Sequence, residues 1–191
     1  RFWTLLRPRK PAPRPSLKAG RELSEVIADK AVSVSAGSLP LPLGKDGGST
    51  LILVPDFKEV RERFTFEGGP AAPMAQVRSL ASRRPGARVA SAPVVTTEVR
   101  RLEPAISRAG SVVFLCFEAM RFAGQKATLE LLNRKAADKT CACLIRNPWD
   151  RELLSPKMTV VDSKGYRSSQ LRAALRRALG VCLLALVPAA F

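Results

Sequence analysis

Charged and amide side chains follow the apolar segments of this sequence that are typical of buried strands. Ligands of open α/β sheets usually bind just outside the carboxyl ends of the strands, so these positions are the first candidates for a functional site. The candidates are Glu118 and Arg121 after residues 111–117, with Gln125 in the helix that follows, and Arg146, Asn147 and Asp150 after residues 140–145. A third such position, after residues 50–54, carries Asp56 and Lys58.

Most kinds of catalytic site are excluded by the residue types available. The chain contains no histidine, which removes the commonest general base and metal ligand and every Ser/His/Asp or Cys/His arrangement. Hydrolysis of a glycosidic bond needs two facing carboxyl groups, and only Glu118 occupies a plausible cleft position. The Gly47-Gly48 and Gly68-Gly69 pairs match neither a P-loop nor a dinucleotide fingerprint. We therefore predict no catalytic residues, no metal site and no cofactor in this chain.

The segment Arg146-Asn147-Pro148-Trp149-Asp150 is the most informative of the strand ends. Pro148 disfavours helical geometry at the residue before it, so Asn147 is free to satisfy backbone groups at the strand end. We expect Asp150 to cap the short helix that follows. Two interpretations stay open, a loop that only holds a strand-to-helix turn and a loop that contacts a ligand.

The four cysteines are Cys116, Cys141, Cys143 and Cys182, and none shows the CxxC spacing of a zinc or redox site. Three of them lie in apolar segments, and the side chains of Cys141 and Cys143 would share one face of a strand. Buried free thiols indicate a reducing compartment, which favours a cytoplasmic location.

Strand and helix patterns alternate along the chain. Strands are expected at residues 31–35, 50–54, 87–93, 111–117, 140–145 and 158–161, and helices at 16–30, 73–84, 97–108, 124–139, 149–154 and 168–179. In the first helix Leu23, Val26 and Ile27 have amphipathic spacing. Thr96 or Thr97 is expected to cap the third helix, and Gly180 to end the last. The alternation predicts a three-layer α/β/α sandwich with a mainly parallel sheet.

The ends of the chain differ from this pattern. Residues 1–15 contain four of the 15 prolines, so we expect a basic arm or linker there and a domain over residues 16–191. The net charge of +16 would attract an anionic partner such as RNA or an acidic protein, through an arm that carries Arg7, Arg9, Lys10 and Arg14. An arginine-rich composition on ordinary solvated faces explains the charge equally simply, and it is favoured because no nucleic-acid motif is present.

No membrane segment or secretory signal is expected from the apolar stretches. Residues 2–6 are too short for the core of a signal peptide, and the eleven residues Val181–Phe191 are too short to span a bilayer. These last residues fit a buried strand or the end of a helix. Because the sequence does not begin with Met, we expect a fragment or a processed product.

The order of motifs resembles the C-terminal domain of family 3 glycoside hydrolases. Residues 22–34 followed by Leu39-Pro40-Leu41 resemble the start of that domain. Residues 112–117, Gly124-Gln125, Leu144–Asp150 and Gly165–Leu175 resemble its later segments in the β-N-acetylglucosaminidase branch, and the likeness covers about residues 20–180.

The resemblance implies a module without its own catalysis. In that family the nucleophilic Asp, and in the glucosaminidase branch the acid/base loop, lie on a preceding (β/α)8 barrel that this chain lacks. The short segment 118–123 fits that branch and makes Glu118 a doubtful catalyst. The resemblance thus implies a domain that packs on a barrel, with residues 118–124 and 146–150 nearest to it. The alternative is a repurposed basic domain that binds RNA or a large assembly.

Overall fold

The computed structural model describes residues 16–35, 37–43, 48–66, 68–69 and 71–180. The expected arm at residues 1–15, with Arg7, Arg9, Lys10 and Arg14, lies outside these residues, as do the apolar segment 181–191 and Cys182. The anionic partner expected for the arm therefore stays a prediction. None of the helices in the part of the chain that is described is long and apolar enough to cross a membrane.

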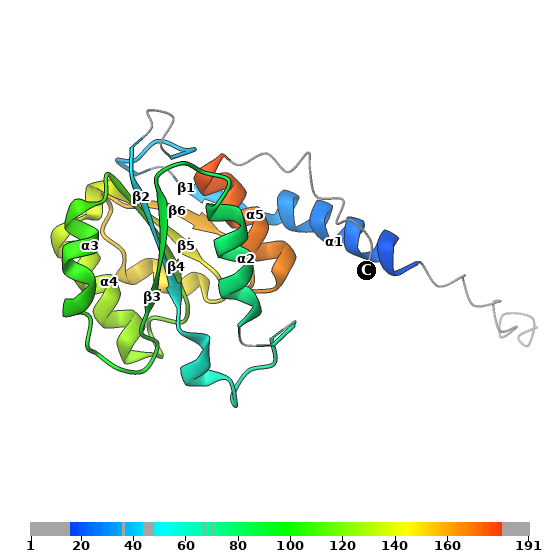
Figure 1. The fold of residues 1–191 in the computed structure, drawn as a ribbon, viewed down its shortest axis with the longest axis horizontal. Coiled ribbons are helices and arrows are strands. Elements are labelled where there is room, and N and C mark those ends of the chain that lie inside the picture. The colour runs from blue at the N-terminus through cyan, green and yellow to red at the C-terminus, as the bar shows by residue number, and fades with distance from the viewer. Residues whose placement is uncertain (1–15, 36, 44–47, 67, 70, 181–191) are drawn as a thin grey trace, which may run out of the picture.

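A six-stranded sheet in the order β1-β6-β5-β4-β2-β3 forms the centre of the fold (Figure 1). Five strands run parallel, and the short edge strand β1 pairs with β6 in the antiparallel direction. The strands are β1 (Ser33–Ser35), β2 (Thr50–Pro55), β3 (Ala87–Ala92), β4 (Ser111–Cys116), β5 (Thr140–Leu144) and β6 (Thr159–Asp162). Strands β2, β4, β5 and β6 are buried throughout, as their continuous apolar character requires.

Helices cover both faces of the sheet, which confirms the predicted α/β/α sandwich. One core lies under α2 (Ala72–Ala81) and α5 (Ser168–Leu179), and the other under α3 (Glu103–Arg108) and α4 (Ala123–Lys135). Side chains of each strand alternate between the two cores, so Ile52 and Val54 of β2 belong to the first and Leu51 and Leu53 to the second. Cys141 and Cys143 share the first core, as their spacing predicts.

Three short 3₁₀ segments replace parts of the predicted helices, namely η3 (Arg100–Leu102), η4 (Ala137–Lys139) and η5 (Pro148–Leu153). A fourth, η2 (Phe57–Val60), lies where no helix was predicted. The prediction that Thr96 or Thr97 caps the third helix is wrong, because α3 begins only at Glu103. Pro104 stands in its first turn, where the missing N–H costs no helical hydrogen bond. Gly180 ends α5 in the left-handed conformation, with φ of 66°, as predicted.

Helix α1 (Leu17–Ala31) forms over the predicted residues but packs by its polar face. The Ser24 hydroxyl donates to the Ser169 hydroxyl of α5 at 3.0 Å. Arg172 Nε donates to the Glu25 carboxylate at 3.1 Å. Arg176 of the same helix donates to Glu25 and Asp29. Amphipathic helices usually turn their apolar stripe to the core. Here ion pairs attach α1 to α5 instead.

The charge network between α1 and α5 predicts an acid-sensitive attachment. Burial raises the pKa of Glu25, but hydrogen bonds and charge from Arg172 and Arg176 outweigh it, so the pKa is lowered overall. The stabilisation is therefore complete above the ordinary pKa of a glutamate and is lost as the pH falls through the lowered value. We expect Glu25→Gln to reduce the free energy of unfolding by about 1 kcal/mol at pH 7 and by nothing in acid.

The measurement is urea unfolding of both proteins between pH 7 and pH 3. Glu22→Gln is the matched control, because Glu22 is exposed on the same helix and approaches only Lys18, at 4.0 Å. An equal effect of both variants, or an effect of Glu25→Gln that persists in acid, would contradict the role assigned to Glu25.

Candidate functional site

The candidate residues gather at the carboxyl edge of the sheet. Because β3, β4 and β5 are parallel, the loops that follow them emerge at the same edge. These loops begin at Pro93, Phe117 and Ile145. The structure brings Glu118, Arg121 and Arg146 together by ion pairs, and it joins Asn147 and Asp150 to the same loop. Asp56 does not belong to this group, since it only caps η2 by accepting from Lys58 N at 3.2 Å.

Glu118 and Arg146 form the charged centre of this edge. Arg146 Nε lies 2.9 Å from Glu118 Oε1, and the exposed guanidinium of Arg121 lies 3.7 Å from Oε2. Glu118 is only 8% exposed. Glu118 Oε2 and Arg146 Nη1 are buried and have no hydrogen-bond partner among the described residues. The pair is therefore closely joined but keeps one unused acceptor and one unused donor.

Aromatic rings surround the Arg146 guanidinium. Its central carbon lies 4.4 Å from the ring centre of Phe64, 5.4 Å from that of Tyr166 and 5.9 Å from that of Phe117. Such contacts stabilise a cation through the negative faces of the rings, most strongly where water is excluded. The rings also contact one another, with Phe117 stacked on Phe122 at 5.8 Å. Arg146 is thus held by both its carboxylate partner and an apolar cage.

Asp150 fixes the loop that carries Glu118. Its carboxylate is fully buried and accepts from Ala119 N at 2.8 Å and from Met120 N at 3.0 Å. Glu118 itself has a φ of 49°, a left-handed conformation that costs a residue other than glycine about 1–2 kcal/mol. The bonds to Asp150 hold the turn in which this conformation occurs.

The prediction that Asp150 caps the short helix is wrong. Asn147 is the cap of η5, and its side-chain oxygen accepts from Trp149 N at 3.2 Å. Its amide nitrogen donates to Asp150 at 3.2 Å. Asp150 is consequently available to bind the neighbouring loop, because Pro148 and Asn147 begin the helix without it. The interpretation of this segment as a structural turn is supported by these bonds.

Gln125 joins two of the loops. Its side-chain oxygen accepts from Phe117 N at 3.0 Å, and its nitrogen donates to the carbonyl of Pro93 at 2.8 Å. Gly124 beside it packs so closely that a Cβ would lie 2.4 Å from the Thr96 carbonyl oxygen. Only glycine allows this approach of α4 to the loop after β3. Gln125 therefore positions the edge and has no free amide group for a ligand.

Several residues of this edge were missed by reasoning from the sequence. Glu59 accepts from the backbone N–H groups of Val94 and Val95, at 2.9 and 2.6 Å, and so holds the loop after β3. Phe64 and Tyr166 belong to the cage of Arg146. One signal was present, because five of the eight phenylalanines fall in the two segments 57–66 and 117–122.

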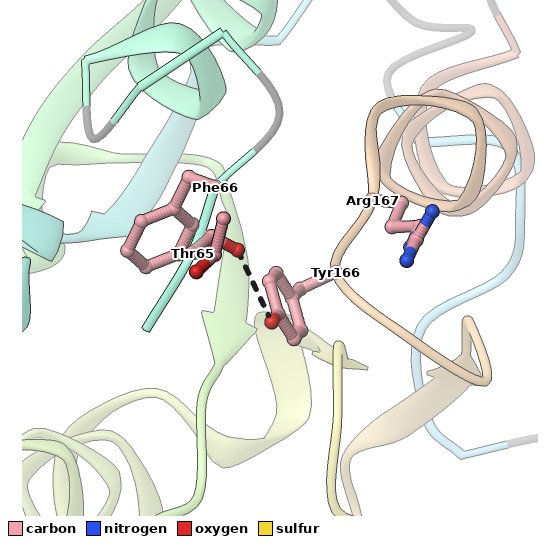
Figure 2. Close-up of a pocket in the computed structure, with 4 residues that line it drawn as sticks. All are labelled: Thr65, Phe66, Tyr166 and Arg167. Carbon is pink, nitrogen blue, oxygen red and sulfur yellow. Dashed lines mark hydrogen bonds between the residues drawn. The ribbon is translucent and has the colours of Figure 1, made fainter. Parts of the chain in front are cut away.

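Figure 2 shows a hollow beside the aromatic cage. It has a volume of about 340 Å³ and is lined by Thr65, Phe66, Tyr166 and Arg167. The Tyr166 hydroxyl donates to the Thr65 carbonyl at 3.5 Å, while Arg167 lies on the other side at the start of α5. None of the six candidate residues lines this hollow. The candidate residues therefore do not form the wall of this hollow.

The chemistry that this edge can perform is limited. Asp150 uses its oxygens to bind backbone N–H groups, and Glu118 is paired with a guanidinium. Burial raises the pKa of the Cys116 thiol, and the charge of Asp150 raises it further, so this thiol is not a nucleophile at neutral pH. Among the described residues no three Cys, Asp or Glu side chains are grouped as metal ligands.

Exposed apolar side chains lie on three of the loops at this edge of the sheet. Val95, Met120 and Trp149 follow β3, β4 and β5 respectively, and each is exposed, Trp149 to 67%. We name these three side chains the apolar rim. Strands β4 and β5 are neighbours, while β2 lies between β4 and β3. Large apolar side chains exposed at one edge of a sheet are typical of interaction surfaces. The edge of the sheet thus resembles a docking face with a polar centre.

Comparison with solved structures shows that this fold occurs in glycoside hydrolase family 3 enzymes. A family 3 β-N-acetylglucosaminidase from Paenibacillus sp. str. FPU-7 matches 91% of this chain with a TM-score of 0.69 and 20% identity. A fungal multi-domain family 3 β-N-acetylglucosaminidase matches 88% with a TM-score of 0.67 and 16% identity. A family 3 β-glucosidase from Bifidobacterium adolescentis matches 90% with a TM-score of 0.53 and 15% identity.

This chain spans only part of each of these enzymes, namely 33%, 19% and 28% of their lengths. No family model and no curated protein sequence matches it. At these identities the likeness establishes the fold. The resemblance seen in the order of sequence motifs is therefore supported at the level of a domain fold found within family 3 enzymes.

Asp150 is predicted to be a structural residue of this edge. In Asp150→Asn the amide can accept with only one atom, so at least one of the N–H groups of Ala119 and Met120 loses its acceptor. We expect the free energy of unfolding to fall by about 2–3 kcal/mol, measured by urea unfolding. Glu152→Gln, an exposed change in the same short helix, should have almost no effect. Equal stability of Asp150→Asn and the unchanged protein would contradict this account.

Arg146 and Glu118 are predicted to depend on each other. Arg146→Met leaves the Glu118 carboxylate buried without its closest partner and should cost about 3 kcal/mol. Glu118→Gln in the same protein removes that charge, so the double variant should lose about 1–3 kcal/mol less than the sum of the single variants. Arg121→Met, which removes the exposed partner, should cost less than about 0.5 kcal/mol. Additive effects of the first two changes would show that the pair is not coupled.

Proposed function

We propose that this chain is the C-terminal, non-catalytic module of a family 3 glycoside hydrolase. Its carboxyl edge would pack on a (β/α)8 barrel and wall one side of the sugar-binding cleft. The observation that carries the proposal is the apolar rim on the loops that also hold Glu118 and Arg146. The structural neighbours support it, since each contains this fold as a minor part of a longer enzyme.

The bonding of the edge agrees with a positioning role. Glu118, Asp150 and Gln125 are all engaged by partners from neighbouring loops, which makes the surface rigid. A rigid face loses little conformational entropy when it binds, so it suits packing against another domain. The resemblance to family 3 implies that hydrolysis would use the nucleophile of the barrel, with retention of configuration.

The length of the loop after β4 supports the β-N-acetylglucosaminidase branch. Only six residues, 117–122, separate β4 from α4, and Asp150 holds them against the sheet. A short, fixed loop has little reach across a cleft. The resemblance places an acid/base Glu of the glucosidase branch on a longer loop at this position. We therefore propose terminal N-acetylglucosamine as the residue that the complete enzyme removes.

The arm and the net charge of +16 do not define a second function here. Several arginines are used inside the fold, where Arg146, Arg172 and Arg176 pair with carboxylates. Each such pair is neutral, so these pairs do not account for the excess of positive charge.

The test combines the chain with the family 3 barrel that the same genome encodes, fused to it or as a separate protein. The chain alone should give no hydrolysis of a chromogenic N-acetylglucosaminide, and the combination should bind and hydrolyse it. Trp149→Asp should weaken binding at least tenfold by placing a charge in the apolar rim. Val34→Asp changes an exposed apolar residue of β1 and is the matched control.

Three outcomes would overturn the proposal. They are hydrolysis of the substrate by the chain alone, a genome that encodes no such barrel, and equally tight binding of the Trp149→Asp and Val34→Asp proteins by the barrel.

A further inference from the structure

Helix α1 presents an apolar surface that no other described residue covers. We name Leu23, Val26 and Ile27 the α1 stripe. Their i, i+3, i+4 spacing places them on one side of the helix, where Leu23 is 60% and Ile27 57% exposed. Figure 1 shows α1 beyond α5, extending away from the sheet. The single buried residue of α1 is Ala28.

The opposite side of α1 is already occupied by α5. The contacts follow the same order along both helices, from Ser24 with Ser169 to Asp29 with Arg176. The carboxyl ends of the two helices therefore lie close together. Rotation of α1 cannot bury the α1 stripe, because it would break the ion pairs of Glu25 with Arg172 and Arg176. The stripe needs a partner from outside the sandwich.

The sequence supplies such a partner directly after α5. Residues 181–191, VCLLALVPAAF, contain no charged side chain and no amide or hydroxyl side chain. They follow Gly180, whose left-handed conformation turns the chain away from the helix axis. Arg84 donates to the carbonyls of Leu43 and Leu179 and so fixes the point from which they start.

The distances allow the contact. Eleven extended residues reach about 36 Å, whereas the 15 residues of α1 span about 22 Å. The segment starts beside the carboxyl end of α1 and can pass along its whole length. The α1 stripe and the sequence of residues 181–191 are both apolar, so burying one against the other is favourable. Of the basic residues near the end of α5, Arg172 and Arg176 are paired with Glu25 and Asp29, and Arg177 is exposed.

We propose that residues 181–191 bind the α1 stripe and complete the outer layer of this side of the sandwich. Helix α1 would then be fixed on two sides, by ion pairs to α5 and by apolar contacts to residues 181–191. This proposal concerns the chain itself and does not rest on the function proposed above.

Cys182 is a built-in probe for this contact. The other three thiols, Cys116, Cys141 and Cys143, are buried. The pKa is raised for Cys143 by its hydrogen bond with Cys141 and by burial, and for Cys116 mainly by burial, so neither reacts readily in the folded protein. Native labelling with a thiol reagent at neutral pH should therefore report on Cys182.

The first experiment measures the labelling rate of Cys182 in the full chain with Leu23→Ser/Ile27→Ser. We expect labelling at least fivefold faster than in the unchanged protein, because loss of the stripe releases residues 181–191. Leu17→Ser is the matched control, since Leu17 is an exposed leucine on the same helix outside the stripe. It should leave the rate unchanged. Light scattering and labelling at two protein concentrations separate an internal contact from one between two copies.

The second experiment uses a chain that ends at Gly180. Hydrogen exchange of the α1 backbone should become at least fivefold faster, while exchange in β4 and β5 stays the same. The proposal is overturned if Cys182 of the unchanged protein labels as fast as a thiol in an unfolded peptide. It is also overturned if truncation leaves α1 exchange unchanged, or if protection of Cys182 depends on protein concentration and so comes from a second copy.

Discussion

The buried carboxylate of Asp150 determines the shape of the candidate site. Asp150 lies in η5, which follows β5, and its carboxylate accepts hydrogen bonds from Ala119 N and Met120 N in the turn after β4. These bonds hold the backbone of Glu118 at its positive φ, a conformation that is unfavourable for residues other than glycine. Because Glu118 faces Arg146, the same carboxylate indirectly sets the position of the charged centre and of the aromatic cage around it. The adjacent exposed residues, Met120 and Trp149, also belong to the segments that Asp150 connects.

The cage of Arg146 links this edge to distant parts of the sequence. Phe64 lies in the segment after η2, and Tyr166 lies just before α5, so three regions of the chain contact one guanidinium. The Arg146 side chain is half-buried, and both a carboxylate and several rings compensate for the hydration that it loses. The result is a rigid surface with a polar centre and apolar surroundings, suited to contact with another domain.

The strands and the layer order could be predicted from the sequence, because continuous apolar segments alternate with helical periodicity. The parallel arrangement then placed Glu118, Arg146 and Asp150 at one edge. The role of Asp150 could not be predicted in this way. The local sequence pattern suggests that Asp150 caps a helix. Which acceptor the N–H groups of Ala119 and Met120 use depends instead on contacts between the segments after β4 and β5, which are distant in the sequence. The cage was missed for the same reason, since Phe64 and Tyr166 meet Arg146 only in the folded chain.

Helix α1 shows a different limit of the sequence pattern. The spacing of Leu23, Val26 and Ile27 correctly predicts an amphipathic helix, but it does not say which surface the helix meets. Glu25 and Asp29 decide that question through Arg172 and Arg176, which lie almost 150 residues away. Charge complementarity between remote segments has no signal in the local pattern of either one.

The carboxyl edge of the sheet is the face that we propose to meet a (β/α)8 barrel. Hydrogen exchange of the chain, measured with and without the family 3 barrel of the same genome, tests it most directly. The account predicts slower exchange in residues 118–124 and 146–150 when the barrel is present, with no change in β1 or β6. Unchanged exchange in both loops, in a mixture shown to form a complex, would contradict it.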